Sequence, residues 1–274
     1  MNATVSSIGT TPVATDYVVA ETRDGVRTIT LNRGERFNPL SRAMLEALEA
    51  ALDRLASERE VRSVVLAGAG RGFCAGHDLK ELRAERSPER RRTIFELCSR
   101  VMLKLTQLPQ PTIARVHGIA TAAGCQLVSM CDLAVATDGA RFALPGVNVG
   151  VFCSTPAVGV GRNVARKRVM EMLLTGEPID AATALAWGLV NRVVPGAELD
   201  AAITRFTDLV AARSASVIAL GKRAFYRQID ATLADAYALT NETMTCNLGD
   251  PDSDEGIDAF LGKRPPHWTG VHDG

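Results

Sequence analysis

An apolar run followed by a turn without bulky side chains most constrains how this chain folds. Residues 64–67 (VVLA) are typical of a buried strand, and Ala75 and Gly76 follow shortly after it. Small residues so soon after a strand let a ligand approach the backbone without obstruction from a Cβ atom. The pattern therefore predicts a ligand-facing turn at the end of this strand.

A second turn of similar character lies about forty residues further along, at residues 116–127 (VHGIATAAGCQL). Two strand-to-helix turns of this kind can each offer a backbone N–H to one oxygen atom. Such a pair of donors stabilises an enolate or a tetrahedral oxyanion. The sequence therefore predicts an oxyanion site built from main-chain groups.

Composition limits the class of protein. The chain has 274 residues, of which 46% are hydrophobic, enough for one domain of about 200–250 residues with a helical appendage. Its formal net charge is zero, which argues against nucleic acid as a partner. No apolar run approaches the roughly 18–20 residues of a membrane helix, so no membrane partner is expected. Scattered histidines and cysteines also argue against a metal site.

The cysteines and the N-terminal residues bear on location. There are six cysteines, without a C-x-x-C pair, and we expect free, mostly buried thiols in a reducing compartment. The first residues lack the basic and apolar regions of a signal peptide and the arginines of a transit peptide. These observations predict a cytoplasmic protein.

Strand and helix patterns alternate in the first half of the chain, and the chain is nearly all helical after Arg162. This order predicts a layered α/β core. Ser41 is the expected N-cap of a helix whose apolar stripe includes Met44, Leu48 and Leu55. The very charged residues 79–92 are expected to form a mobile surface loop leading into a helix at 93–108.

Several motifs occur in a specific order: LNR at 31–33, FCAGHDLK at 73–80, HG…GCQL at 117–127, CDLAVA at 131–136, TGEPIDA at 175–181, AWGLVN at 186–191 and FLGKRP at 260–265. Together they resemble the enoyl-CoA hydratase/isomerase (crotonase) superfamily, from about Tyr17 to Trp268. Residues 145–156 (PGVNVGVFCSTP) further resemble one subgroup of that family.

The resemblance implies an α/β fold, a crotonase-like spiral of ββα units with a C-terminal helical trimerisation region. We expect a disordered N-terminal tail at 1–15, the spiral core at 16–205 and the helical region at 206–274. The implied assembly is a homotrimer, or a hexamer as a dimer of trimers. The implied ligand is an acyl-CoA thioester, with coenzyme A as part of the substrate and no cofactor bound covalently.

The same resemblance implies which residues form the site. The thioester oxygen would lie between the backbone N–H groups of His77 and Ala123. The CoA moiety would contact residues of the two loops and one lysine near the C-terminus: Arg36, Phe37, Ala75, Asp78, Leu79, Lys80 and Lys263. Arg36 and Lys263 are equally well explained as solvated surface charges, and Asp78 is better explained as the N-cap of a helix beginning at Leu79.

The chain departs from the family at both hydratase glutamates. One position is Gln126, which cannot relay a proton, and the other is Gly146. Because each positioned acid or base typically contributes about 10²–10⁴-fold, ordinary hydratase activity is expected to be weak or absent. Ala123 also replaces a glycine of the oxyanion hole, which an alanine backbone tolerates in the usual L-residue regions.

Three side chains are candidates for other roles. Cys153 could act as a nucleophile if its pKa were lowered at a helix N-terminus. Ser154 lies about where some isomerase relatives carry an acid, but an N-cap role is favoured. The His77 side chain would lie beside the oxyanion site, although a polar side chain turned away from the pocket is favoured.

Several functions stay open. The first is an acyl-CoA enzyme that uses the oxyanion hole for isomerisation, decarboxylation or thioester cleavage. The second is a non-catalytic acyl-CoA-binding or scaffold homologue, and the third is a structural protein without a CoA site. A doubly wound nucleotide-binding fold is disfavoured, because no G-x-G-x-x-G follows the first strand and no P-loop pattern exists.

Overall fold

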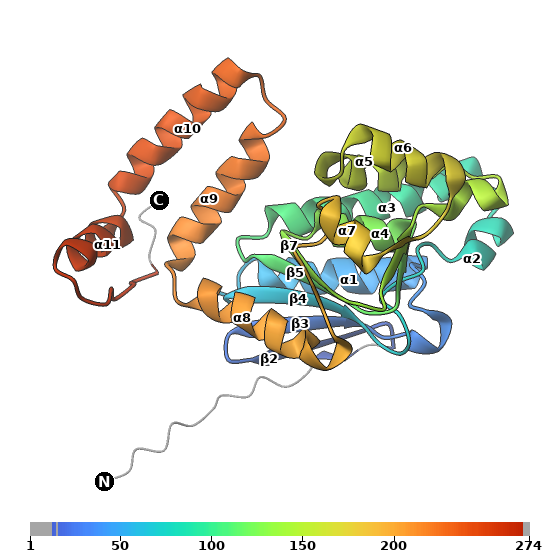
Figure 1. The fold of residues 1–274 in the computed structure, drawn as a ribbon, viewed down its shortest axis with the longest axis horizontal. Helices are drawn as coiled ribbons and strands as arrows, with labels where there is room; N and C mark the ends of the chain where they lie inside the picture. Colours follow the sequence, from blue (N-terminus) through green and yellow to red (C-terminus); the bar gives the residue numbers. More distant parts are fainter. Residues whose placement is uncertain (1–12, 15, 271–274) are drawn as a thin grey trace, which may run out of the picture.

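The computed structural model describes residues 13–14 and 16–270, and a seven-stranded sheet forms its centre (Figure 1). The strand order is β1-β2-β3-β4-β5-β7-β10, antiparallel from β1 to β3 and parallel from β3 onward. The strands are β1 Val13–Ala14, β2 Val18–Arg23, β3 Val26–Leu31, β4 Ser63–Gly68, β5 Thr112–Val116, β7 Leu133–Thr137 and β10 Arg192–Val194.

A second sheet has three short strands in the order β6-β8-β9. Strand β6 (Ile119–Thr121) follows β5 almost directly and leads into helix α4 (Ala123–Met130), so β5, β6 and α4 form one ββα unit. Strand β8 (Arg141–Ala143) lies parallel to β6 and antiparallel to β9 (Ile179–Asp180). This arrangement confirms the expected spiral of ββα units.

Helices cover both faces of the large sheet. On one face, Val64 and Leu66 of β4 share a core with α1 (Arg42–Leu55) and α3 (Pro88–Gln107). On the other face, Val65 of the same strand packs with α8 (Leu199–Ala211). The two cores follow from the alternation of side chains along a strand. Ser41 caps α1, as expected, by accepting a hydrogen bond from the Met44 N–H.

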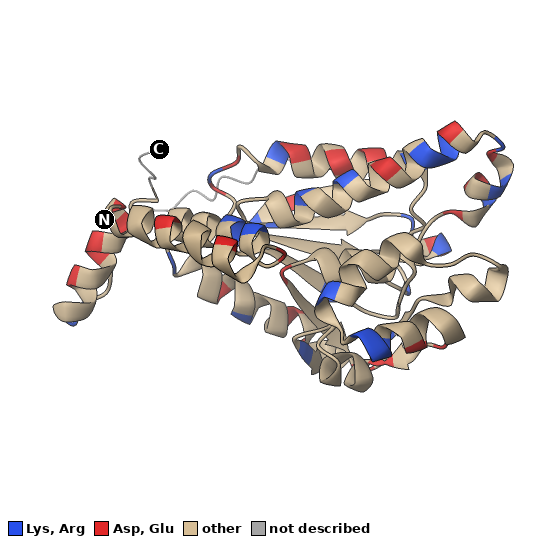
Figure 2. Cartoon of the chain, turned by 90° about the horizontal axis from the view of Figure 1, so that it is seen from above, with Lys and Arg blue, Asp and Glu red and all other residues tan. Residues whose placement is uncertain are grey.

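The charged segment after the first turn is more ordered than the sequence indicated. The expected loop at 79–92 instead contains α2 (Leu79–Ala84) and the first turn of α3. Ser87 caps α3 and Pro88 occupies its first turn, a combination that starts helices. Further helices around the core are α5 Ser154–Asn163, α6 Arg166–Thr175 and α7 Ala181–Ala186. Figure 2 shows basic and acidic residues together on several helices of the molecule.

The C-terminal helices α9 (Ala215–Gln228) and α10 (Leu233–Leu248) form a hairpin that extends from the sheet, followed by α11 (Pro251–Leu261) (Figure 1). We call residues 215–270 the C-terminal arm. Among the described residues, α10 buries none of its side chains. Large apolar side chains are exposed on the arm: Phe225, Ile229, Leu233, Tyr237, Met244, Leu248, Ile257, Phe260 and Leu261.

Two expected boundaries differ from the structure. The division between 205 and 206 falls inside α8, which packs on the sheet as part of the core. Of the expected N-terminal tail at 1–15, residues 13–14 form β1 and pair with β2, while residues 1–12 and 15 lie outside the described part. Among the helices described, none has the length and apolar character needed to cross a membrane.

Candidate active site

The first turn is held by one buried side chain, Asn38. Its Nδ2 lies 2.9, 2.9 and 3.0 Å from the carbonyl oxygens of Ala69, Gly72 and Phe73, and its two hydrogens are shared among these three acceptors. Its Oδ1 accepts from the Arg33 N–H at 2.8 Å. Asn38 is fully buried with a φ of 52°, a conformation that asparagine tolerates better than most residues. Sequence reasoning missed this residue, although it fixes the path of the chain from β4 into the turn.

The last residues of this turn form hydrogen bonds with Leu40, which shortly precedes α1. The Leu40 N–H donates to the Gly76 carbonyl at 2.8 Å, and the Asp78 N–H donates to the Leu40 carbonyl at 3.4 Å. In such a parallel bridge the intervening residue, His77, directs its own N–H away from the partner. Among the described residues, the His77 N–H has no acceptor.

The second turn is held by backbone contacts on both sides. The Thr121 N–H donates to the Cys74 carbonyl and the Ala122 N–H to the Ala143 carbonyl, each at 2.9 Å. Ala123 then begins α4, where the first N–H groups have no partner within the helix. The described chain offers the Ala123 N–H no acceptor. The strained residue is Ala122, with a φ of 49°, and not Ala123, on which the sequence analysis concentrated.

The two turns meet at Gly76. A Cβ atom at this position would lie 2.9 Å from the Thr121 carbonyl oxygen and 3.1 Å from the Ala123 nitrogen. Gly124 has a similar constraint, because a Cβ there would lie 2.1 Å from the Cys74 carbonyl oxygen. Glycine is therefore required at both contacts, and it brings the segments that carry His77 and Ala123 together.

The His77 side chain packs between α3 and the start of α1. Its Nδ1 lies 3.2 Å from the Leu40 carbonyl oxygen, and its ring meets Phe95 edge to face, with 5.3 Å between centroids. Burial lowers the pKa of His77, which favours the neutral ring with Nδ1–H donated to Leu40. The buried Nε2 then has no partner within the described chain.

Most of the expected CoA-binding residues lie near the first turn. Arg36 forms an ion pair with Asp78, with 3.2 Å between Nη2 and Oδ2. Asp78 also caps α2, by accepting from the Lys80 and Glu81 N–H groups. The Leu79 and Lys80 side chains are exposed, and Ala75 donates its N–H to the Phe37 carbonyl. Lys263 follows α11 (Pro251–Leu261), and Figure 1 shows α11 at the opposite end of the molecule from α2.

The two positions that replace the family glutamates differ in whether they have room for a carboxylate side chain. Gln126 is only 4% exposed, and its Oε1 has no hydrogen-bond partner in the part of the chain that the structure describes. Gly146 lies in a short 3₁₀ helix (Pro145–Val149) within the loop before α5, where a Cβ atom would be 2.3 Å from the Val151 carbonyl oxygen and 2.9 Å from the Cys153 Sγ. A glutamate would fit the first position and not the second.

The loop before α5 offers no activated nucleophile. Cys153 is 7% exposed, and burial raises its pKa, which keeps the thiol protonated. Ser154 is exposed and is the first residue of α5, so the expected N-cap role is wrong: Cys153 holds the N-cap position without a side-chain bond. Burial likewise raises the pKa of Cys74, Cys98, Cys125 and Cys131 to about 12.

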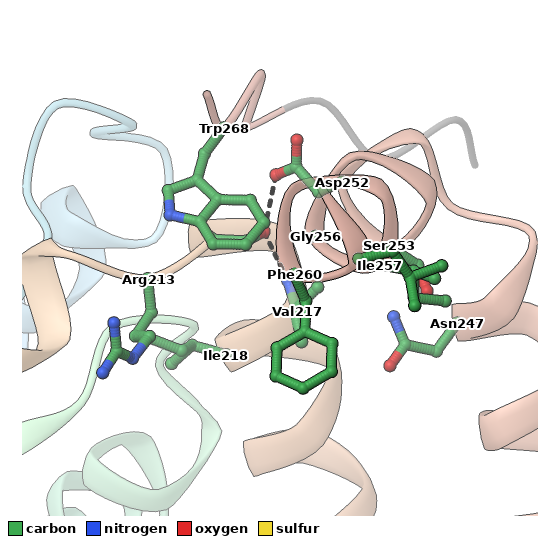
Figure 3. A pocket seen from close by; sticks show the side chains of 12 residues that line it. Arg213, Val217, Ile218, Asn247, Asp252, Ser253, Gly256, Ile257, Phe260 and Trp268 are labelled. Carbon is green, nitrogen blue, oxygen red and sulfur yellow. Dashed lines mark hydrogen bonds between the residues drawn. The ribbon is translucent and has the colours of Figure 1, made fainter. Parts of the chain in front are cut away.

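A cavity of about 500 Å³ lies in the C-terminal arm (Figure 3). Its walls are mainly apolar and include Ile218, Ile257, Phe260 and Trp268. None of its lining residues belongs to either turn. The cavity is therefore separate from the site at Gly76.

Comparison with known proteins identifies the class. The family model described as enoyl-CoA hydratase/isomerase matches residues 21–271, and the chain belongs to this family. It is 47% identical to enoyl-CoA hydratase domain-containing protein 3, mitochondrial, of Rattus norvegicus, over 90% of this chain and 82% of the rat protein. The Homo sapiens protein of the same name is 46% identical over 90% of this chain and 81% of its own. The subgroup indicated by residues 145–156 is thereby confirmed.

Solved structures give the same result for the fold. A crystal structure of an enoyl-CoA hydratase of Mycobacterium smegmatis is 54% identical, with a TM-score of 0.90 over 92% of this chain and 98% of that chain. The crystal structure of human enoyl coenzyme A hydratase domain-containing protein 3 is 46% identical, with a TM-score of 0.89 over 92% of this chain and all of that chain. The crotonase-like fold is therefore established.

The comparisons overturn the expected cytoplasmic location. The vertebrate relatives named above carry the word mitochondrial in their names, which points to the mitochondrion. The prediction rested partly on the cysteines, of which five are buried. Thiols that burial keeps protonated are inert, so their number says little about the compartment.

Proposed function

We propose that this protein processes acyl-CoA thioesters, with the thioester oxygen held between the N–H groups of His77 and Ala123. The observation that carries the proposal is the contact at Gly76. Because glycine has no Cβ atom, the Ala123 N–H stays accessible to a ligand. Two main-chain donors without acceptors in the described chain, on segments that meet at Gly76, suit the negative charge of an enolate. Family membership supports the acyl-CoA ligand.

The CoA moiety would bind along Arg36, Phe37, Ala75 and the start of α2. Lys263 would reach the CoA phosphates from a neighbouring subunit, because α11, which it follows, lies far from α2 within one chain (Figure 1). The assembly that we propose is a homotrimer, or a hexamer of two trimers. The exposed apolar side chains of the C-terminal arm support such an assembly, since large apolar patches usually mark interfaces.

The reaction would be one that does not need the two glutamates. Isomerisation, decarboxylation and thioester cleavage are the candidates, and loss of CO₂ produces an enolate directly, without a base. The second candidate function is a non-catalytic acyl-CoA-binding or scaffold homologue. It is favoured by the loop at Gly146, which has no room for a carboxylate side chain.

Gly76→Ala tests the oxyanion site. We expect its affinity for butyryl-CoA, measured by calorimetry, to fall at least about tenfold, because the added methyl group would lie beside the Ala123 nitrogen. Gly188→Ala is a matched control: its φ is +85° against +87° for Gly76, and the nearest atom to its Cβ is 3.4 Å away. Circular dichroism shows whether both variants are folded. Equal affinities in the two folded variants would contradict the proposed site.

Crotonyl-CoA hydration tests the reaction. We expect the rate to be roughly 10⁴-fold or more below that of an ordinary hydratase, because two acid/base groups are absent. Gln126→Glu should not restore it, since the loop at Gly146 cannot take the second group. A rate comparable to that of ordinary hydratases would refute this interpretation. Micromolar binding without conversion of any thioester in a panel would favour the non-catalytic homologue.

A further inference from the structure

A second cavity, of about 260 Å³, lies where the C-terminal arm joins the rest of the protein. Its walls come from residues 56–62 before β4, from residues 109–111 before β5 and from the first turns of α9. Strands β4 and β5 are parallel, so the cavity lies at the edge of the sheet where both strands begin. The two turns of the candidate active site follow the opposite ends of these strands. The cavity is therefore a separate site.

One buried side chain that lines this cavity, Gln110, has a hydrogen-bond acceptor that the folded chain does not use. Gln110 is 7% exposed, and its Nε2 donates to the Leu55 and Glu58 carbonyl oxygens at 2.9 and 3.2 Å. These bonds fix the orientation of the carboxamide, because a flipped amide would direct its oxygen at two other oxygens. The buried Oε1 has no partner among the described residues. An unpaired buried oxygen is costly, so it calls for a donor from a ligand or an ordered water.

Two arginines give the cavity a positive charge. Arg59 is exposed and Arg62 is half-buried, and both line it. The Arg62 Nη2 donates to the Arg213 carbonyl oxygen at 2.5 Å, which uses one of the five N–H donors of a guanidinium. The acidic residue on the same wall, Glu58, is already paired with Arg27. Guanidinium groups bind carboxylates well, so the charge favours a carboxylate ligand.

We propose that this cavity binds a short apolar carboxylate with a hydrogen-bond donor on the carbon next to the carboxylate, as in an α-amino acid or an α-hydroxy acid. The donor would pair with Gln110 Oε1, and the carboxylate with Arg59 and Arg62. The hydrocarbon chain would lie against Val61 and Ile218, which also line the cavity. The volume is below the roughly 300–1,000 Å³ typical of sites for drug-sized ligands, which favours a small molecule whose polar groups are close together.

A ligand at this position would connect the arm to the body, because Arg62 and Val61 precede β4 whereas Ile218 and Ala219 belong to α9. Gln110 already contributes to that connection, since its carbonyl oxygen accepts from Lys222 of α9 at 2.9 Å. Binding would therefore stabilise the attached position of the arm. This inference goes beyond the proposed function and does not depend on it.

Calorimetry of the full-length protein with three five-carbon ligands tests the proposal. We expect L-norvaline and L-2-hydroxypentanoate to bind at least about tenfold more tightly than pentanoate, because pentanoate leaves the Gln110 oxygen unpaired. Arg59→Met should weaken binding of L-norvaline at least about fivefold, since it removes a cation and keeps the apolar stem. Arg54→Met is the matched control: Arg54 is also exposed, in the last turn of α1, but does not line the cavity.

A variant that fills the cavity provides an independent test. Ala219→Leu should abolish binding, whereas Ala224→Leu should not, because Ala224 is also half-buried on α9 but does not line this cavity. L-Norvaline should slow proteolytic cleavage of the arm in the wild type and in Ala224→Leu only. If the wild type bound neither L-norvaline nor L-2-hydroxypentanoate, or bound pentanoate equally well, the proposal would be wrong, and the Gln110 oxygen would be paired with water. Undiminished binding by folded Ala219→Leu would also overturn it.

Discussion

Asn38→Ala is expected to destabilise the protein by at least about 4 kcal/mol. The substitution leaves three carbonyl oxygens without their donor: those of Gly72 and Phe73, which are buried, and that of Ala69, which is half-buried. Each unsatisfied buried group costs about 1–3 kcal/mol. Alanine also adopts the φ of 52° less readily than asparagine. Chemical denaturation followed by circular dichroism measures the change in the free energy of unfolding.

Asp24→Ala is the control that separates the loss of hydrogen bonds from the cost of placing alanine at a positive φ. Asp24 is exposed in the hairpin between β2 and β3 and has a φ of 49°, close to that of Asn38. We expect this control to cost about 1 kcal/mol, the conformational part alone. If Asn38→Ala lowered the free energy of unfolding no more than Asp24→Ala, the hydrogen bonds of Asn38 would not be what holds the turn in place. Asn38→Ala should also weaken acyl-CoA binding, because the turn leads directly to Gly76.

Lys222→Met is expected to cost about 3–5 kcal/mol, because it removes one partner of a nearly buried ion pair. Lys222 of α9 lies 2.6 Å from the Asp132 carboxylate and donates to the Leu105 and Gln110 carbonyls at 2.9 Å. The Tyr226 hydroxyl donates to the other oxygen of Asp132 at 2.9 Å. Burial lowers the pKa of Lys222, and the Asp132 charge opposes that shift. The cluster attaches the C-terminal arm to the core.

Arg100→Met is the control for this prediction. Arg100 of α3 forms an ion pair at 2.9 Å with Glu49 of α1, but the Arg100 side chain is 54% exposed. Exposed pairs of this kind contribute little, so we expect almost no change in thermal stability. Limited proteolysis provides a second measurement, because Lys222→Met should make the arm easier to cleave and Arg100→Met should not. Equal stability of the two variants would show that the buried cluster does not attach the arm.

Local patterns predicted much of the fold correctly. The apolar stripe of α1 is buried as expected, and Ser41 and Asp78 cap α1 and α2. Periodicity and capping depend on residues within a few positions of one another, so they can be recognised in the sequence. The segment at 79–92 was mispredicted because its charge outweighed the start signals at Ser87 and Pro88. Exposed charges suit the outer face of a helix as well as a loop.

The candidate site was predictable only in outline. Gly76 and Gly124 stood out because turns near ligands favour glycine, and the structure explains both by close backbone contacts. Asn38 carried no such signal, since its three acceptors lie more than thirty residues further along the chain. Ala122 was overlooked because its strained φ results from the bonds of the surrounding turns, not from its residue type.

The order of motifs along the chain was sufficient to determine the family and the two turns, because small residues and apolar periods are local properties. Tertiary structure alone decided which polar groups are left without partners. The closed space at Gly146 depends on Val151 and Cys153 folding over it, and the unpaired amide of Gln126 depends on what surrounds α4. The attachment of the C-terminal arm joins Asp132 to Lys222, ninety residues apart. Such contacts arise from chain packing, which short-range sequence patterns do not encode.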